Sequence, residues 1–283
     1  MAATEREVKE ADVGEETDQA SHWNKSAGQA WVETQGLVDE LFKPIEDLLV
    51  ESVPAGGRVL DVGCGTGATT VAAARRSDSV GIDISEPMIE AARARAERAG
   101  VTARFVRADA EDHAFEPGSF DAVMSRFGVM FFGDPVKAFA NLRRATRDGG
   151  ALRLVVWRGA EENPFMTTAE RAAAPLLPNL PERRPDAPGQ FAFADDGKVR
   201  AVLEDGGWGD IGVRPLDVDC VMPEKELVTY LTRFGPVGLA LPDADERTRG
   251  KVVEAVRPAF DSYVHGDEVR FTAALWTITA RAA

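Results

Sequence analysis

The hydrophobic positions of this chain alternate between short apolar runs and longer segments with helical spacing. Apolar runs that predict strands lie at residues 58–62, 79–84, 103–107, 120–125, 151–157, 213–222 and 269–280. Segments that predict helices lie between most of these runs, at residues 68–76, 86–99, 135–148 and 196–205. A strand followed repeatedly by a helix is typical of an α/β fold built on a parallel sheet.

Segments outside this alternation divide the chain further. The first segment is charged and contains no aromatic residue, which predicts disorder. Apolar residues between Leu37 and Leu49 recur at helical spacing and predict a helical lid, bent at Pro44. A proline-rich stretch predicts an insertion with a short helix at residues 167–174, and helical stretches at residues 225–241 and 244–264 predict a cap. The expected order along the chain is an acidic segment (1–20), a lid (21–56), the core (57–158), an insertion (159–191), a second part of the core (192–221), a cap (222–265) and the last core strand (266–283).

Residues that favour helix ends mark two of these helices. Ser85 is expected to be the N-cap of the helix over residues 86–99, and Gly100 is expected to end it. Asp195 is expected to cap the helix that runs to Gly206. These residues set the expected bounds of both helices.

Composition and charge narrow the function classes. The 283 residues carry a formal charge of −14, so the averaged surface field repels phosphate backbones and argues against a nucleic-acid partner. Cys64 and Cys220 each lie in an apolar run, which favours buried thiols in a reducing compartment over a disulfide. The first residues lack the apolar core of a signal peptide, and no apolar run reaches the roughly 18 residues of a membrane span. We therefore expect a cytoplasmic protein without a membrane span.

The strongest chemical signal is a glycine-rich turn directly after the first strand. Residues 59–67 read Val-Leu-Asp-Val-Gly-Cys-Gly-Thr-Gly, which places bare backbone at the carboxyl end of a strand, where a ligand can approach. A dinucleotide-binding GxGxxG loop occupies the same place in other proteins, but the spacing here is GxGxG. Asp61, which precedes the first glycine, is unfavourable beside a pyrophosphate and favourable beside a cationic amino group. The combination favours a cofactor that carries an amino acid.

Around this motif the sequence resembles the class I S-adenosylmethionine methyltransferases, motif by motif over residues 57–158 and by strand order beyond them. The resemblance implies a Rossmann-like fold: a seven-stranded, mostly parallel sheet with an antiparallel last strand, helices on both faces and a helical cap. It implies S-adenosylmethionine as the cofactor and S-adenosylhomocysteine as the product. Residues at successive strand ends match the family's cofactor-binding positions: Asp61, Gly63 and Gly65 for the methionine part, Asp83 for the ribose, Ile84, Met88, Asp109 and Ala110 for the adenine, and Ser125 near the sulfonium.

A longer segment points to a subgroup of this family. Residues 125–150, with the Trp-Asn pair at Trp23 and the Asn-Pro pair at Asn163, are similar to bacterial small-molecule methyltransferases, some of which act in secondary metabolism. This implies a small-molecule acceptor, methylated at O, N or C, and a monomer or homodimer. No acidic triplet or cysteine set indicates a metal site. The candidates for acceptor binding are Trp23, Arg126, Phe127, Met130, Tyr230 and Phe234.

Methyl transfer needs a proton acceptor when the acceptor group is a hydroxyl or a protonated amine. The chain has three histidines, of which His22 on the lid and His265 at the end of the cap are better placed for catalysis than His113. Arg126, just after the fourth strand, is the third catalytic candidate. It can contact the cofactor carboxylate or a substrate anion, or it can pair with a neighbouring acid.

Other function classes stay open at this stage. A protein or RNA methyltransferase would need an open trough over the fourth strand, and the acidic charge argues against it. A protein that binds S-adenosylmethionine but catalyses a different reaction would carry the same cofactor loop. A nicotinamide oxidoreductase is the most distant alternative, and it would have to bind the reduced nicotinamide.

Overall fold

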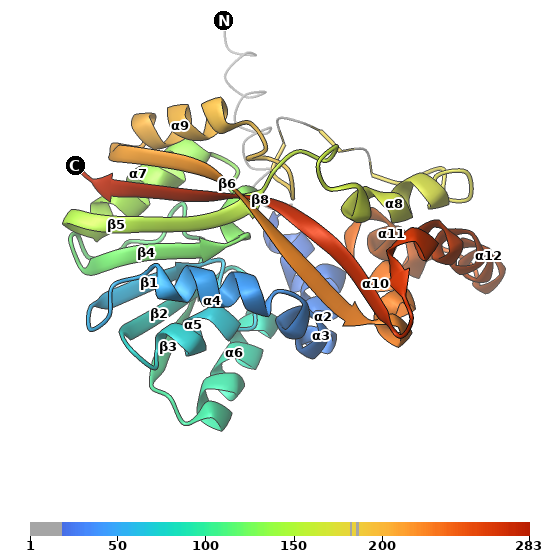
Figure 1. Ribbon diagram of the computed structural model, residues 1–283. Coiled ribbons are helices and arrows are strands. Elements are labelled where there is room, and N and C mark those ends of the chain that lie inside the picture. Colours follow the sequence, from blue (N-terminus) through green and yellow to red (C-terminus); the bar gives the residue numbers. More distant parts are fainter. Residues whose placement is uncertain (1–18, 182, 185–186) are drawn as a thin grey trace, which may run out of the picture.

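The computed structural model describes residues 19–181, 183–184 and 187–283, which surround a central sheet (Figure 1). The strand order is β3-β2-β1-β4-β5-β8-β6, and the short β7 pairs with β8 outside this path. β1 to β5 pair in parallel, whereas β8 is antiparallel to β5 and to β6. The predicted Rossmann-like sheet with an antiparallel last strand is therefore confirmed. The strands are β1 Arg58–Val62, β2 Asp78–Asp83, β3 Ala103–Arg107, β4 Phe120–Arg126, β5 Thr146–Trp157, β6 Trp208–Pro223, β7 Val264–His265 and β8 Glu268–Ala282.

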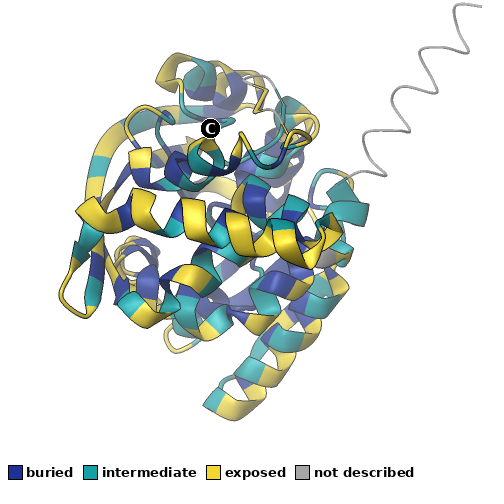
Figure 2. Ribbon diagram, turned by 90° about the vertical axis from the view of Figure 1, so that its right-hand side faces the viewer, coloured by how far each residue is buried: buried dark blue, intermediate teal, exposed yellow. Residues whose placement is uncertain are grey.

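Helices cover both faces of this sheet. α4, α5 and α6 lie side by side on one face, and α7 and α9 lie on the other (Figure 1). β1 is buried between the two layers, which is why Val59, Leu60 and Val62 are all apolar. Figure 2 shows the buried residues gathered on the strands and on the inward sides of the helices. The core helices are α4 Lys43–Glu51, α5 Ala68–Ala73, α6 Glu86–Ala99, α7 Pro135–Ala145 and α9 Asp196–Asp205.

Two of these helices have the ends that the sequence predicted. α6 stops at Gly100, which adopts the left-handed conformation with φ 63°. Asp195 caps α9, since its Oδ1 accepts a hydrogen bond from the backbone N–H of Lys198 at 2.7 Å. Glycine tolerates the left-handed region without strain, and an aspartate cap satisfies an amide that has no partner within the helix.

The lid consists of several short helices before β1. Residues 19–24 are helical, and α2 Ser26–Glu33 and α3 Gln35–Leu41 follow. The bend predicted at Pro44 lies at Phe42, where α3 ends, because Pro44 fits the first turn of α4, which needs no amide donor. Of the segment predicted to be disordered, residues 1–18 lie outside the described residues.

β6 and β8 are longer than predicted and form a ribbon that carries the cap. Trp157, the last residue of β5, pairs with Leu275, and the pairing of β8 with β6 continues beyond this point to Glu268. The ribbon thus extends past the carboxyl ends of the parallel strands, where the cap helices lie (Figure 1). The remaining helices are α8 Pro164–Ala173, α10 Leu227–Arg233, α11 Gly235–Ala240 and α12 Glu246–Val256, with short turns η1 Gly128–Phe131, η2 Glu224–Glu226, η3 Leu241–Asp243 and η4 Arg257–Tyr263.

The cap helices are shorter than the sequence pattern predicted. The helix expected over residues 225–241 is broken at Phe234, because Gly235 has φ 66° and Pro236 follows. The helix expected over residues 244–264 ends as an α-helix at Val256, just before Pro258. In the described ranges, no helix has the length and apolarity needed to cross a membrane.

Candidate cofactor and acceptor site

The glycines in the turn after β1 have no side chains, so neighbouring atoms can lie directly against the backbone. Gly63 has φ 64°, and a Cβ placed there would lie 2.5 Å from the Cα of Gly128, so the turn packs directly on the loop after β4. Gly65 has φ 52° but open space around it, since its Cβ would meet only the Met88 Sδ, at 3.6 Å. Gly63 therefore serves the packing of two loops, whereas Gly65 leaves an accessible patch of backbone that suits the methionine part of the cofactor.

Asp83, at the end of β2, lies beside this turn. Its Oδ2 accepts a hydrogen bond from the Gly65 N–H at 2.8 Å, and its Oδ1 accepts one from the Ser85 N–H at 2.9 Å. Burial raises the pKa of this carboxyl, although the hydrogen bonds from Ser85 and Gly65 act in the opposite direction. The carboxylate is held in one orientation, and each oxygen keeps a lone pair that can accept from a ribose hydroxyl.

Asp61 and Arg126 form a charged centre in which Asp61 is buried and Arg126 is partly buried. Asp61 is 1% exposed, and its Oδ2 accepts a hydrogen bond from the Thr70 hydroxyl at 2.6 Å. Burial raises the pKa of Asp61 to about 7, while Thr70 and Arg126 oppose the shift. The Arg126 Nη1 atom is buried, and no residue of the described chain accepts a hydrogen bond from it. An amino acid fits this centre, because its ammonium group suits Asp61 and its carboxylate would satisfy the guanidinium.

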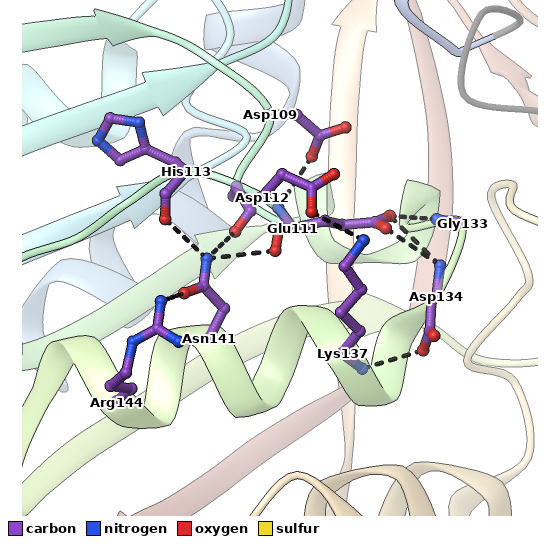
Figure 3. Close-up of polar contacts among 10 residues, drawn as sticks. Asp109, Glu111, Asp112, His113, Gly133, Asp134, Lys137, Asn141 and Arg144 are labelled. Carbon is purple, nitrogen blue, oxygen red and sulfur yellow. Dashed lines mark hydrogen bonds and ion pairs between the residues drawn. The ribbon is translucent and has the colours of Figure 1, made fainter. Parts of the chain in front are cut away.

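The loop after β3 is fixed by a network around Asn141 (Figure 3). The Asn141 side chain donates to the backbone carbonyls of Ala110 at 2.9 Å and of His113 at 3.0 Å. Asp109 Oδ1 accepts from the backbone N–H of Glu111 at 2.9 Å, and the Glu111 carboxylate accepts from backbone amides at the start of α7. This network presents Asp109 and Ala110 at the carboxyl edge of the sheet, next to the Asp83 strand, as an adenine contact requires.

The lid is tied to the loop that carries Asp83. The Ser85 hydroxyl donates to the carbonyl oxygen of Trp23 at 2.7 Å, so Ser85 does not cap α6 through its side chain as predicted. The cap comes instead from Asn24, whose Oδ1 accepts from the Glu86 N–H at 2.8 Å, while its Nδ2 donates to the Ile84 carbonyl at 3.2 Å. One turn of the lid thus holds the loop that carries Asp83.

A cavity of about 1160 Å³ lies between the lid, the strand ends, the insertion and the cap. Its walls hold three of the five tryptophans and seven of the fourteen phenylalanines, so it suits a ring-containing ligand. Charged residues also line it: Glu161, Glu170, Arg183, Arg184, Asp195, Lys198 and Arg233. The predicted residues that line it are His22, Trp23, Phe127, Met130, Tyr230 and Phe234. Burial raises the pKa of Tyr230, whose hydroxyl lies 3.4 Å from the Met166 Sδ, and this tyrosine is therefore unsuited to accept a proton.

The structure separates the other predicted residues from this cavity. Ser125 is fully buried, its hydroxyl donates to the Val62 carbonyl at 2.7 Å, and the Gly128 N–H donates to it at 3.2 Å. Its hydroxyl thus connects the ends of β1 and β4, and contact with the cofactor stays a prediction. His265 is exposed on β7, at the far end of the ribbon, and does not line the cavity. The geometry therefore favours His22 over His265 as a proton acceptor.

Sequence reasoning missed several residues that matter here. Phe42 and Trp157 line the cavity and pack against Phe127, and Asn24 caps α6 from the lid. Trp157 could have been found, since it ends a strand at the same sheet edge as Phe127. The roles of Phe42 and Asn24 were not predicted, although Asn24 belongs to the Trp-Asn pair, because these roles depend on contacts between distant segments. Among the described residues, no group of three or more His, Cys, Asp or Glu side chains is arranged to hold a metal ion.

Comparison with known proteins agrees with this geometry. A family model described as a methyltransferase domain matches residues 59–150. An aklanonic acid methyltransferase of Streptomyces sp. is 37% identical over 185 residues, which cover 60% of this chain and 84% of that protein. An uncharacterized protein of Mycobacterium tuberculosis is 29% identical over 180 residues, which cover 61% of this chain. The matched part of the chain spans 62% of the length of that relative.

Solved structures of low identity share the fold. The YcgJ protein of Bacillus subtilis has a TM-score of 0.56 at 17% identity, covering 84% of this chain and 98% of that one. The cyclase SpnF has a TM-score of 0.55 at 20% identity, covering 90% of this chain and 94% of that one. Since a cyclase shares the fold, the fold alone does not decide the reaction.

Proposed function

The chain belongs to the class I S-adenosylmethionine-dependent methyltransferases, and we propose that it methylates a small molecule with an extended apolar body. The observation that carries this proposal is the aromatic cavity, which begins at the carboxyl ends of β4 and β5 beside the glycine turn. Walls from the lid, the insertion and the cap suit a small molecule better than a protein or RNA segment. The Streptomyces relative is named for a small-molecule acceptor, aklanonic acid, which supports the same class of acceptor, while a role in secondary metabolism stays a prediction.

S-adenosylmethionine supplies a methyl group on a positively charged sulfur: an acceptor lone pair forms the new bond to carbon, the carbon–sulfur bond breaks, and its electron pair stays on sulfur. The protein binds both molecules, aligns them and excludes water. Asp83 would accept from the ribose hydroxyls, and Asp109 with Ala110 would contact the adenine edge, which Ile84 and Met88 would flank. Arg126 would bind the cofactor carboxylate, since its Nη1 lacks a partner in the described chain and the residue does not line the acceptor cavity.

His22 is the proton acceptor that we propose for acceptors with a hydroxyl or ammonium group. It lies on the lid, and its ring packs edge-on against Trp23 at 5.1 Å, on the wall of the cavity. In the described part of the chain it is the one histidine that lines this cavity. His22→Gln is expected to lower kcat and to abolish the acidic limb of the pH–rate profile, while cofactor affinity stays unchanged.

Calorimetric titration with S-adenosylmethionine and S-adenosylhomocysteine tests the cofactor assignment. Asp83→Ala is expected to weaken both ligands by about 1–3 kcal/mol, because both contain the ribose. Asp78→Ala is the matched control, since Asp78 lies at the opposite end of the same strand and pairs with Arg104 on the surface. The control is expected to bind both ligands as the native protein does.

A screen of polycyclic and other apolar acceptors then tests the reaction, with formation of S-adenosylhomocysteine as the readout. Acceptor-dependent formation of the product supports methyl transfer. Binding of the cofactor and conversion of an acceptor without consumption of S-adenosylmethionine would instead support a different reaction on the same fold. A native protein that binds neither cofactor form would refute the proposal.

A further inference from the structure

Arg95, on α6, connects two segments that lie far apart in the sequence. Its Nε donates a hydrogen bond to the carbonyl oxygen of Thr66 at 2.8 Å, in the glycine turn after β1. Its Nη1 forms an ion pair with Asp39 Oδ2 at 2.6 Å, and its Nη2 donates to Gln35 Oε1 at 2.9 Å. Asp39 and Gln35 both belong to α3 of the lid. One guanidinium therefore binds the glycine turn and a lid helix at the same time.

The glycine turn depends on contacts from its neighbours. Gly65 and Gly67, on either side of Thr66, have φ values of 52° and 81°, and glycine leaves the backbone more freedom than any other residue. The turn packs directly on α6, because a Cβ at Gly67 would lie 2.7 Å from the Cβ of Ala92. Arg95 lies about one helical turn beyond Ala92, on the same face of α6. Its bond to the Thr66 carbonyl fixes the peptide unit between the two glycines.

α3 also depends on contacts with the rest of the chain. It has seven residues, and no side chain caps its N-terminus. A helix of this length is not stable by itself in water. Within the described ranges, all side-chain hydrogen bonds and ion pairs between α3 and residues outside the lid go to Arg95. This connection is separate from that of Asn24, which holds an earlier turn of the lid.

α3 carries part of the wall of the acceptor cavity. Val38 lies in this helix and Phe42 follows it directly, and both side chains line the cavity. The side chains of Arg95 and Asp39 are 19% and 22% exposed, so water screens their ion pair less than a pair on the open surface. The guanidinium is planar and presents its donors in a fixed fork, so the direction of the bond to the turn constrains the direction of the bonds to α3.

We propose that Arg95 is a positioning residue that couples the glycine turn to α3, so that binding of the cofactor orders the wall of the acceptor cavity. This inference rests on the proposed function, because it requires a cofactor on the turn. A ligand against the Gly65 backbone restricts the turn, Arg95 passes this restriction to α3, and Val38 and Phe42 are fixed in consequence. Coupling between two binding sites is reciprocal, so an acceptor held by this wall strengthens cofactor binding by the same factor.

Hydrogen exchange of the α3 amides tests this inference, measured by mass spectrometry with and without saturating S-adenosylhomocysteine. In the native protein, saturation is expected to slow exchange over residues 35–42 by about 5-fold or more, the lower end of typical coupling between sites. In Arg95→Gln the slowing is expected to fall below about 2-fold, although the ligand still fills the site. The readout is the ratio of the two exchange rates within each protein.

Two control variants separate coupling from a general effect on stability. Arg93→Gln changes the same residue type on the same helix, where Arg93 donates to the Phe105 carbonyl at 3.2 Å. Leu37→Ala weakens the packing of α3, since Leu37 is partly buried against the core, and leaves the contacts of Arg95 in place. Leu37→Ala is expected to speed exchange equally with and without ligand. Both variants are therefore expected to keep the native ratio.

Asp39→Ala removes the connection from the side of the lid and leaves the bond between Arg95 and Thr66 in place. It is expected to lose the slowing of α3 exchange as Arg95→Gln does. Thermal unfolding shows whether each variant is folded. Asp39→Ala keeps the inference testable if Arg95→Gln does not fold.

The outcomes separate the two proposals. A native protein that binds S-adenosylhomocysteine without slower exchange in α3 would overturn the coupling and leave the proposed function in place. Native slowing in folded Arg95→Gln or Asp39→Ala would have the same meaning, as would a loss of slowing in Leu37→Ala that equals the loss in Arg95→Gln. A native protein that binds neither cofactor form would refute the proposed function itself.

Discussion

Replacing Asn24 by alanine tests whether the lid is held to the cofactor site by one side chain. The Asn24 Oδ1 accepts from the Glu86 N–H at 2.8 Å, and its Nδ2 donates to the Ile84 carbonyl at 3.2 Å and to the Ala20 carbonyl at 2.7 Å. Loss of a helix N-cap costs about 0.5–2 kcal/mol. The bonds to Ile84 and Ala20 contribute less, because Asn24 is only partly buried and water can replace them.

We therefore expect Asn24→Ala to lower the free energy of unfolding by about 1–2 kcal/mol, or the melting temperature by about 2–6 °C. The loop that it releases carries Asp83, so the Kd of S-adenosylmethionine is expected to rise as well. Thermal unfolding and calorimetry measure both effects. In a double-mutant cycle with Ser85→Ala, a coupling of at least about 0.5 kcal/mol is expected, since Ser85 ties the same lid turn to the same loop through Trp23.

Gln29→Ala is the control for this prediction. Gln29 lies on the same lid, is exposed and bonds only to Glu33 one turn away, at 3.2 Å. Its replacement is expected to change stability by less than about 0.5 kcal/mol. Equal melting temperatures for Asn24→Ala and Gln29→Ala would refute the reasoning. A destabilised Asn24→Ala protein with native cofactor affinity would limit the role of Asn24 to capping α6.

Three further predictions follow from buried groups. Since burial raises the pKa of Asp61 from 3.8 to about 7, the native protein loses stability as pH rises through this range, and Asp61→Asn is expected to melt above the native protein beyond about pH 7 but not below about pH 4. Melting temperatures of both proteins across pH check this sign. Gly128→Ala would place a Cβ 2.6 Å from the Gly63 backbone and is expected to cost about 1–3 kcal/mol in urea unfolding, whereas Gly36→Ala, in α3 with nothing within 4 Å, is expected to be neutral or stabilising. Asn141→Leu leaves buried carbonyls of the loop after β3 without a donor and is expected to cost about 2–4 kcal/mol in the same assay.

The residues predicted on the cofactor side lie together in the structure because their sequence signals are local. Residues 59–67 predict a strand followed by a glycine turn, and the glycines of this turn have positive φ in the structure. Asp83 lies at the end of the next strand. Parallel strands bring their carboxyl ends to one edge of the sheet, so the order of strands is enough to gather these residues. The hydrogen bond between Gly65 and Asp83 is the result.

The acceptor side was less predictable because it depends on packing between distant segments. The alternation of apolar residues predicted β6 only from residue 213 onward. The first part of the strand is irregular: its register with β8 shifts between Gly209 and Gly212, and Asp210 adopts φ 50°. The extra length of β6 and β8 carries the cap beyond the sheet and leaves His265 exposed at the tip of the ribbon. From the sequence, His22 and His265 were equally good candidates for the proton acceptor. The length of the ribbon places His265 away from the cavity and leaves His22 as the candidate that lines it.

This division between the two sides has a physical consequence for specificity. The residues proposed to bind the cofactor lie on strand ends and loops of the core, whereas most of the cavity wall belongs to the lid, the insertion and the cap helices on the ribbon. A substitution in the insertion, such as Phe165→Ala, changes the shape of the cavity through its contacts with Phe260 and Phe271 and touches none of the cofactor loops. Acceptor choice can therefore change through the cap while the cofactor loops keep their geometry. Phe127 and Trp157 are the exception, since Phe127 follows β4, Trp157 ends β5, and both line the cavity.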